Sequence, residues 1–397
     1  MKNIINNIKY RGRCYLMKIG LNAKYAFDEK VRGIGKYTLE LIKNISEIDF
    51  ENKYILYVDD IHSNKELVNL LPNNFKIKKL NVSNYFIYEQ ILLPQYIKKD
   101  GIDLFHATGN TFPIFTNSKL ITTIHDVMFL KSGDIIPKPK TLYQKLGKYY
   151  RKTNLNWINK NEKIITVSNY SKKDINEETN FKLSNIEVTY LGYDKDFLDY
   201  NIEDSKTIKI KNKLDISDDF FYHLGGDSAN KNSEQVIKIY SELPSEVINQ
   251  YQLIITGIKH NREKWYKKIE KYGLNRDRVI FTGYVSDEEL KFLYNNATIF
   301  IFLSIYEGFG IPILEAMSSS TPVIASNKTV IPEIVGEGGI IVDPDNIDEV
   351  KTRIIELINS QKLKNKFIEK GFKNLKRFDW IKLAQKTLSI YNEVYKK

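Results

Sequence analysis

The chain of 397 residues is long enough for two domains with substantial cores, and its 42 % hydrophobic and 27 % charged content is typical of a soluble globular protein. The net charge of +11 lies in the first half, because residues 1–195 carry 31 Lys and Arg against 20 Asp and Glu, whereas residues 196–397 carry 29 of each. The single cysteine, Cys14, excludes an internal disulfide framework and fits a reducing compartment. No apolar stretch of about 18 residues predicts a membrane-spanning helix, and the N-terminus lacks the apolar core of a signal peptide.

The chain opens with a polar, basic extension, residues 1–16. Two explanations stay open: Met17 is the natural start, or the extension is a short basic arm that touches a membrane. The first strand is expected at residues 17–22, and a helix with apolar spacing follows the pair Gly33 and Gly35. This Gly-x-Gly pair lacks the third glycine of a dinucleotide-binding fingerprint, which argues against a dehydrogenase.

Strand-like and helix-like stretches then alternate, which predicts a doubly wound parallel sheet with ligands at the carboxyl ends of its strands. The expected strands are residues 53–58, 75–80, 104–106 and 120–124, with a helix over 85–96.

Two histidines are expected at such strand ends, His106 and His125. Each either binds a sugar hydroxyl or steadies charge in a transition state, or else is buried and bonded to backbone carbonyls. Asp126 either orients His125 or caps the next segment.

Residues 138–163 are basic and aromatic and include Tyr143, Tyr149 and Trp157. A helix of this kind can lie on a membrane surface, or it can be an ordinary amphipathic surface helix. The next stretch, from Lys163, reads as a strand followed by a helix that Ser168 or Ser171 can cap.

Residues 196–217 are polar and form the candidate linker between a first domain, residues 17–195, and a second domain, residues 218–377. The second domain begins with a strand and a loop that contains Gly225 and Gly226 and opens a helix. In this loop Lys231 is placed to reach a phosphate as a point charge, unless it is a surface lysine. The remaining expected strands cover residues 251–256, 279–283, 297–303, 322–326 and 339–342.

Two further turns are predicted at helix starts in this domain. Ser286 and Glu289 have the spacing of a capping box. Asp343-Pro344-Asp345 is predicted to be a turn rather than a metal site, with Asp345 capping the next helix.

The stretch from Phe302 to Thr321 reads as a buried strand, a loop with Gly308 and Gly310, and a helix with Pro312 at its first position. Backbone amides at such a helix start attract anions, phosphate above all.

Glu307 and Glu315 flank this loop with the spacing Glu-x7-Glu. Since carboxylates repel phosphate, they are expected to accept hydrogen bonds from hydroxyls, and the combination suits a nucleotide sugar. Taken singly, Glu315 could merely favour the helix dipole and Glu307 could be a solvated loop residue.

The segment from Glu307 to Glu315 resembles the Glu-x7-Glu signature of retaining GT-B glycosyltransferases of family 4, the glycosyl transferases of group 1. The resemblance extends over nearly the whole chain from Met17, and the loop at Gly225 is similar to loops of bacterial polysaccharide mannosyl- and rhamnosyltransferases. It implies an α/β fold of two Rossmann-like domains that face each other across a cleft, with a C-terminal helix, residues 378–397, packed back on the first domain.

The resemblance also implies roles for individual residues. The first Glu contacts the donor sugar and the second the nucleotide ribose, while His125 approaches the donor sugar. The family usually has Arg-Lys-Asn where this chain has Asn230, Lys231 and Asn232, so one cation is missing and Lys36 is a candidate substitute. The candidate catalytic residues are His125, Glu307 and Lys231. The candidate donor-binding residues are Gly33, Gly35, Lys36, Gly225, Gly226, Lys231, Asn232, Tyr284, Val285, Gly308, Phe309, Gly310, Ile311 and Glu315. The candidate acceptor-binding residues are His106 and Asp126.

The function so implied is transfer of a hexosyl unit, with retention, from a nucleotide sugar to a glycan or lipid-linked glycan in cell-surface polysaccharide synthesis. No metal and no other cofactor is expected. The expected location is the cytoplasm, with attachment to the inner face of an anionic membrane as a further hypothesis. The alternatives are another GT-B enzyme, namely a nucleotide-sugar epimerase or a phosphorylase, and a basic nucleic-acid-binding protein. The last has no recognisable motif to support it, and no nucleic acid partner is expected.

Overall fold

The computed structural model describes residues 16–28, 31–59, 65–131, 141–198, 200, 202–258 and 262–396. The chain divides into two compact units. Unit 1 comprises the described residues up to Thr123, residues 159–164, and the C-terminal stretch from Ala384. Unit 2 comprises residues 124–158 and 165–383.

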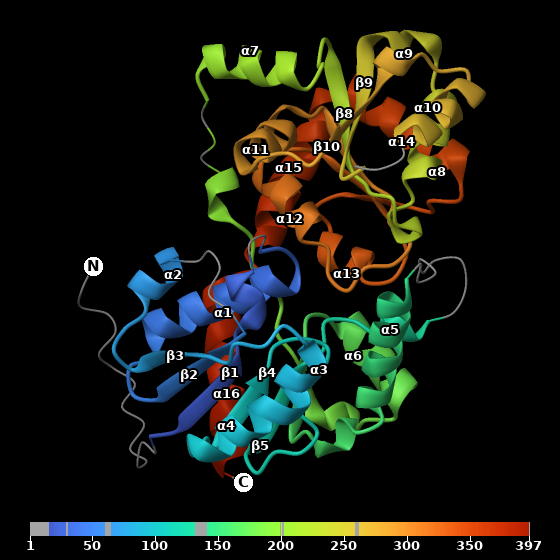
Figure 1. The fold of residues 1–397 in the computed structure, drawn as a ribbon. Helices are drawn as coiled ribbons and strands as arrows, with labels where there is room; N and C mark the ends of the chain where they lie inside the picture. Colours follow the sequence, from blue (N-terminus) through green and yellow to red (C-terminus); the bar gives the residue numbers. More distant parts are fainter. Residues whose placement is uncertain are drawn as a thin grey trace. The chain divides into compact units, whose positions relative to one another are not determined.

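The first sheet has seven strands in the order β3-β2-β1-β4-β5-β6-β7 (Figure 1). Neighbouring strands from β3 through β5 are parallel; Ile19 of β1, for example, pairs with Tyr54 of β2 and with Leu104 of β4. The order reverses between β1 and β4, as in a doubly wound sheet. The strands are β1 (Lys18–Asn22), β2 (Lys53–Val58), β3 (Phe75–Lys79), β4 (Leu104–Ala107), β5 (Lys119–Thr123), β6 (Lys163–Thr166) and β7 (Ile186–Val188).

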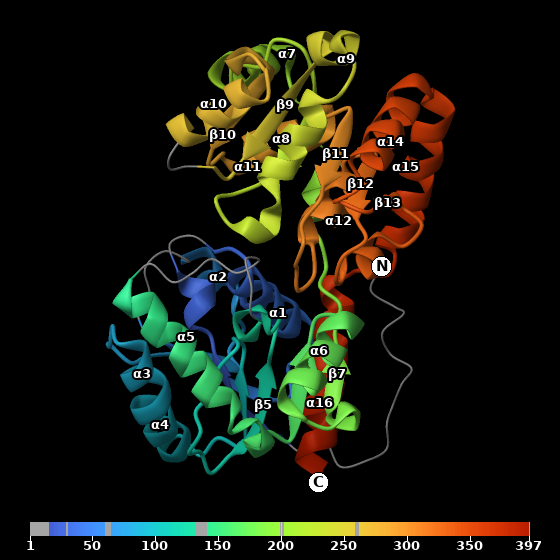
Figure 2. The ribbon, with the colours of Figure 1, turned by 90° about the vertical axis from the view of Figure 1, so that its right-hand side faces the viewer.

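The second sheet has six parallel strands in the order β10-β9-β8-β11-β12-β13 (Figure 2). Its order reverses between β8 and β11, so the loops after these two strands begin side by side. The strands are β8 (Asp219–Leu224), β9 (Tyr251–Thr256), β10 (Val279–Gly283), β11 (Ile299–Phe302), β12 (Val323–Ser326) and β13 (Ile340–Val342).

Both faces of the second sheet are buried, which explains why its strands are almost continuously apolar. Phe221 joins a core with residues of α8 (Ser233–Ser241), α10 (Arg262–Lys271) and α14 (Ile347–Asn359). Its neighbour Tyr222 points the other way, since successive side chains of a strand alternate, and its ring meets Tyr294 of α11 (Asp287–Asn296) at a centroid distance of 5.0 Å.

The remaining helices complete the two layers around the sheets. They are α1 (Ile34–Ile48), α2 (Lys65–Leu70), α3 (Tyr85–Ile87), α4 (Leu93–Lys99), α5 (Leu142–Leu155), α6 (Asn169–Thr179), α7 (Asp204–Lys213), α9 (Ser245–Gln250), α12 (Ile311–Ser318), α13 (Ile331–Val335), α15 (Gln361–Leu375) and α16 (Trp380–Lys396). Within the residues that the structure describes, every helix is too short or too polar to span a bilayer.

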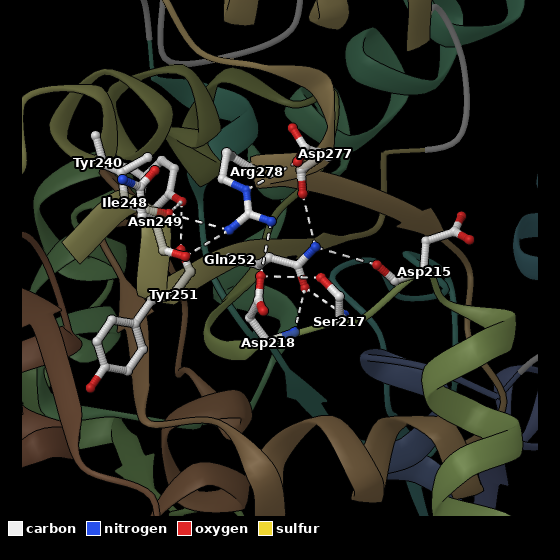
Figure 3. A network of polar contacts seen from close by, with 10 residues as sticks. All are labelled: Asp215, Ser217, Asp218, Tyr240, Ile248, Asn249, Tyr251, Gln252, Asp277 and Arg278. Carbon is white, nitrogen blue, oxygen red and sulfur yellow. Dashed lines mark hydrogen bonds and ion pairs between the residues drawn. The ribbon is translucent and has the colours of Figure 1, made fainter. Parts of the chain in front are cut away.

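The amino ends of β8, β9 and β10 are joined by a polar network (Figure 3). The buried amide of Gln252 donates to the carbonyls of Asp277 (2.8 Å) and Asp215 (3.4 Å), and its oxygen accepts from the N–H groups of Ser217 (2.9 Å) and Asp218 (3.3 Å). Every polar atom of this side chain is thus satisfied inside the protein.

The ion pair of Arg278 with Asp218, 2.9 Å, extends the network at its border. Arg278 also donates to the carbonyl of Asn249 at 3.1 Å. The polar side chains at the amino ends of β8, β9 and β10 are therefore bonded to groups of the protein itself.

The predicted fold class, two doubly wound parallel α/β domains, is confirmed by the strand orders. The predicted capping box of Ser286 and Glu289 is present, and Ser168 rather than Ser171 caps α6. The prediction that Asp345 caps α14 is wrong: Asn346 accepts from the N–H of Glu349 instead, and Asp345 pairs with Lys328.

Two expected segments differ from their predictions in detail. The helix expected over 85–96 contains a π-helical segment at residues 88–92, between α3 and α4. The candidate linker contains the helix α7, whose Ile210 is buried. The expected domain boundaries stay a prediction, as does a cleft between the domains, and the extension 1–16 lies outside the described residues except for Leu16.

Candidate functional site

The loops that follow β8 and β11 form the candidate site, at the carboxyl end of the second sheet where the strand order reverses. The first loop runs from Gly225 to Asn232, and the second from Leu303 to Gly310. Open α/β sheets bind their ligands at this position.

The first loop rests on a chain of hydrogen bonds that begins at His223. Its Nδ1 lies 2.9 Å from the carbonyl of Ile301, which can only accept, so Nδ1 carries the proton. Nε2 therefore accepts from Ser233 Oγ at 3.2 Å, and Ser233 Oγ accepts from the N–H of Gly226 at 3.2 Å. Burial lowers the pKa of His223 to about 4, assisted by the charge of Lys231 and opposed by the bond to Ile301, so the imidazole is neutral near pH 7.

Gly225 sits where a side chain has no room. A Cβ there would lie 2.5 Å from Ser233 Oγ and 2.9 Å from a methyl carbon of Ile255. Gly226 is different, because the nearest atom to its Cβ would be 3.7 Å away. The backbone of this loop can thus be approached closely at Gly226, while Gly225 is required for packing.

Two asparagines fasten the first loop to the second. Asn230 donates from its side chain to the carbonyl of Tyr306 at 3.1 Å, and its own carbonyl accepts from the N–H of Ile305 at 2.7 Å. Asn232 adopts a left-handed conformation, φ 57°, and donates to the carbonyl of Leu303 at 3.1 Å. The two loops are therefore held as one unit.

At the centre of this unit, Lys231 and Glu307 form an ion pair with 2.8 Å between Nζ and Oε1. Both side chains are partly exposed, at 23 % and 16 %. The pair presents a cation and a carboxylate at one place, which can serve a phosphate and a sugar hydroxyl respectively.

Helix α12 begins directly after the second loop. Gly310, with φ 110°, precedes it, Ile311 is its first residue and Pro312 its second, one position later than predicted. Its first turn contains no acidic residue. Pro312 has no N–H, and the N–H of Ile313 donates to the carbonyl of Gly310 at 3.0 Å, so among the first three residues only Ile311 has an N–H that can bind an anion. Phe309 is buried against Tyr190 and does not point into solvent.

Glu315 lies in the second turn of α12, beside two buried tyrosines. Burial, and then the charge of Glu315, raise the pKa of Tyr294 well above its ordinary value. Tyr222, whose hydroxyl lies 3.0 Å from Thr256 Oγ1, has its pKa raised by burial and to a smaller degree by Glu315. Because both tyrosines stay protonated, they can donate hydrogen bonds in the region of this carboxylate.

Gly308 brings the second loop to His125 and Asp126, all within unit 2. A Cβ on Gly308 would lie 2.9 Å from the carbonyl of His125 and 3.1 Å from Asp126 Cβ. Two hydroxyls face the Gly308 carbonyl, those of Ser168 at 3.1 Å and Ser171 at 3.2 Å. The structure thus places the predicted His125 next to the Glu-x7-Glu loop.

Asp126 occupies an unusual electrostatic position. Burial raises the pKa of its carboxyl to about 6, the bond from the N–H of Met128 opposes this shift, and the charges of Glu307 and Asp174 add to it. A carboxyl that titrates near neutrality beside Glu307 can hold a proton at the edge of the site.

The loop after β10 carries Tyr284 and Val285. Tyr284 is 56 % exposed and Val285 is half-buried. Gly257 follows the neighbouring strand β9 and packs on the first loop, since its Cβ would lie 2.6 Å from the carbonyl of Gly225. Tyr284 is thus available for contact with a base, which stays a prediction.

Unit 1 holds the remaining predicted donor-binding residues. Gly33, with φ 51°, is the residue before α1. Gly35 packs on the backbone of Tyr25, because a Cβ there would lie 2.6 Å from the Tyr25 carbonyl. Lys36 lies 3.4 Å from Glu40 one turn along the helix.

His106 is fully buried, which argues against acceptor binding. Its Nδ1 lies 2.6 Å from the hydroxyl of Tyr391, and its Nε2 lies 2.7 Å from Thr123 Oγ1. Both ring nitrogens are thus bonded inside unit 1. His106 is buried, as the alternative to ligand binding expected, but its partners are two side-chain hydroxyls and not backbone carbonyls.

Three residues of this site were not predicted from the sequence: His223, Ser233 and Thr329. Thr329 Oγ1 accepts from the N–H of Glu307 at 3.3 Å. A histidine near the end of β8, two residues before Gly225, was a usable signal for the first of them. The other two act through contacts that the chain order does not reveal.

Known proteins resemble the chain over both halves. Residues 204–374 match the family model of the glycosyl transferases group 1, and residues 31–197 match that of Glycosyltransferase Family 4. The chain is 25 % identical over 375 residues to O-antigen chain mannosyltransferase B of Escherichia coli, which covers 90 % of this chain and 95 % of that protein. It is 29 % identical over 285 residues to O-antigen chain mannosyltransferase RfbU of Salmonella typhimurium, covering 70 % of this chain and 71 % of that protein.

Among solved structures, HepE of Anabaena in complex with UDP-glucose has the same fold. The TM-score is 0.68 at 18 % sequence identity, and the match covers 95 % of this chain and all of that one.

Proposed function

Because the chain belongs to the glycosyltransferases of group 1 and family 4, we propose that it transfers a mannosyl unit from a nucleotide sugar to a glycan or lipid-linked glycan during polysaccharide synthesis. The choice of mannose rests on relatives named as O-antigen mannosyltransferases. A nucleotide-sugar donor is supported by the UDP-glucose complex of a protein with this fold.

The observation that carries the proposal is the ion pair of Lys231 and Glu307 between two glycine-bearing loops. We expect Lys231 and the N–H of Gly226 to bind the diphosphate, together with the N–H of Ile311 at the start of α12. Glu307 then accepts hydrogen bonds from hydroxyls of the donor sugar. Glu315 is proposed to bind the ribose, and Tyr284 and Val285 to frame the base.

The proposed chemistry is transfer with retention of the anomeric configuration. As the bond to the leaving diphosphate breaks, negative charge grows on the phosphate, and Lys231 and the loop amides stabilise it. The donor phosphate removes the proton of the acceptor hydroxyl. His125 is proposed to steady the positively charged sugar ring or bind one of its hydroxyls, and Asp126 to lie on the acceptor side.

The test is a thermal-shift series with GDP, UDP, dTDP and their common sugar conjugates. A ligand that binds only the folded state raises the melting temperature, and at a hundred times its Kd it adds about 2.7 kcal/mol. We expect the largest shift with GDP-mannose, and a smaller shift for the variant Lys231→Ala. The matched control is Lys366→Ala, an exposed lysine of α15.

Two outcomes would overturn the donor site. One is the absence of any shift with every diphosphate at millimolar concentration. The other is an equal shift for the wild-type protein and Lys231→Ala. A product formed from the donor alone, without an acceptor, would favour an epimerase over a transferase.

A further inference from the structure

Helix α5 turns an apolar stripe outward instead of inward. Leu142, Leu146 and Tyr149 are 72 %, 58 % and 68 % exposed. Their spacing, i, i+4 and i+7, puts them on one face of a helix with 3.6 residues per turn. An amphipathic surface helix ordinarily buries such a stripe, so we expect an exposed stripe to bind another surface.

The opposite face of α5 holds the helix in place. Asn154 and Leu155 are buried, and the guanidinium of Arg151 lies 5.5 Å from the ring of Phe129. These three residues lie roughly half a turn away from the exposed stripe. The capping box of Thr141 and Gln144 fixes the first turn. The outward direction of the stripe therefore follows from the packing of the helix.

The segment that carries the stripe is basic. Residues 141–161 contain five Lys and Arg and no Asp or Glu. Lys145 and Lys152 lie on the flank of the stripe beside Tyr149, and both are exposed. Long basic side chains beside an apolar face can reach anionic headgroups while the face enters the boundary of the acyl region.

We propose that this face of α5, namely Leu142, Leu146 and Tyr149 with Lys145 and Lys152, binds the surface of an anionic lipid bilayer. The charge decides among the occupants: a second copy would bring five more positive charges against the same segment, and like charges oppose such pairing. A nucleic acid would use the lysines but leave the stripe in water, since its affinity comes from phosphate contacts. Of these three occupants, an anionic bilayer is the one that uses both the charges and the stripe.

This inference deepens the proposed function and rests on it in one respect: the lipid-linked form of the acceptor would then be met at the surface on which α5 lies. Binding of α5 itself needs neither donor nor acceptor.

The test is cosedimentation of the full chain with vesicles of phosphatidylcholine, with and without 30 % phosphatidylglycerol, at 50 and 300 mM salt. We expect binding to the anionic vesicles that weakens as salt screens the charges. Each lysine near a membrane contributes about fivefold in affinity, so Lys145→Gln with Lys152→Gln should lower binding about 25-fold. Leu142→Ser with Leu146→Ser should lower it about tenfold or more at either salt concentration.

Matched controls separate this face from general stickiness. The side chain of Leu70, in helix α2, is 59 % exposed, a fraction similar to that of Leu146. Because Leu70 lies outside the α5 face, Leu70→Ser should bind vesicles like the wild-type chain. Lys362→Gln with Lys366→Gln removes two exposed lysines of α15 and should also have little effect. The donor-induced thermal shift is measured on every variant, so that loss of folding or of the donor site is distinguished from loss of lipid binding.

Three results would overturn the proposal. The first is no binding of the wild-type chain to anionic vesicles at 50 mM salt. The second is binding that the α5 variants leave unchanged. The third is a wild-type dimer in light scattering that Leu142→Ser with Leu146→Ser converts to a monomer, because the occupant would then be a second copy. If the wild-type chain binds vesicles but no donor raises its melting temperature, the proposed function is wrong and the proposed membrane-binding face of α5 is still supported.

Discussion

The two ends of the second sheet use polar residues in opposite ways. At the amino end, Gln252 and Arg278 are surrounded by partners from the protein itself, and the network is closed. At the carboxyl end, Lys231 and Glu307 pair with each other but stay partly exposed among glycine loops and a helix start. At the amino end, the polar side chains are bonded within the protein. At the carboxyl end, Lys231 and Glu307 can exchange their mutual ion pair for bonds to a ligand, as a binding site requires.

The largest expected effect is at the carboxyl end. Glu307→Ala should lower the rate of transfer about 10²–10³-fold, since it removes the group proposed to orient the donor sugar. The ion pair is partly exposed, so the melting temperature should change little. The control is Glu337→Ala, which removes an exposed carboxylate paired with Lys370. Full turnover by Glu307→Ala would remove this residue from the mechanism.

The amino end should respond in stability and not in chemistry. Gln252→Ala leaves two N–H groups and two carbonyls without their partner, which costs about 3 kcal/mol of unfolding free energy. Urea unfolding measures the loss, with the exposed Gln361→Ala as control, and the rate per folded molecule should be unchanged. A variant that kept its stability but lost activity would contradict the division between the two ends.

His223 lies under the first loop and should make the free energy of unfolding depend on pH. Its folded pKa of about 4 is below the unfolded value of about 6.5, so the unfolded chain binds the extra proton first. Stability is therefore complete above pH 6.5 and falls as the pH drops toward 4, by about 2 kcal/mol at pH 5. Urea unfolding at pH 7.5 and 5 should show this fall in the wild-type chain and a smaller one in His223→Asn. Parallel profiles for the two proteins would exclude His223 as the cause.

The smallest expected effect is on donor affinity, and it is tested by substituting two neighbouring glycines. Gly225→Ala should weaken donor binding about tenfold, because its Cβ would lie 2.5 Å from Ser233 Oγ and would disturb the hydroxyl that accepts from the N–H of Gly226. Gly226→Ala has room in the free protein, so its stability should be unchanged. Titration of both variants with donor measures their affinities. If Gly226→Ala also binds the donor more weakly, a ligand atom approaches the backbone of Gly226 closely. If Gly226→Ala binds the donor as the wild-type chain does, the diphosphate lies elsewhere.

Much of the fold could be predicted from the sequence because parallel strands buried on both faces are nearly continuous apolar runs. The runs at residues 53–58 and 299–302 identify β2 and β11 for this reason. The capping box at Ser286 was equally predictable, since all its atoms come from four consecutive residues. The π-helical turn at residues 88–92 was not, because no local signal distinguishes it from α-helix.

For the site, the sequence predicted the glycine loops and the two glutamates but not their support. His223 and Ser233 act on Gly226 through side-chain contacts that need the folded backbone. His106 misled for a similar reason: its position at a strand end suggested a ligand, whereas its partner Tyr391 lies 285 residues further along the chain. Long-range hydrogen bonds of this kind decide whether a strand-end histidine is functional, and a single sequence does not show them.

That bond between His106 and Tyr391 has a consequence for the order in which the protein is made. Helix α16 contributes its residues from Ala384 to unit 1, and a ribosome adds roughly 5–20 residues per second. Tyr391 is therefore synthesised roughly 15–60 s after His106 of strand β4, and all strands of the second sheet are synthesised in between. During biosynthesis the first domain begun is thus the last one finished, and its buried histidine is covered only when the end of the chain arrives.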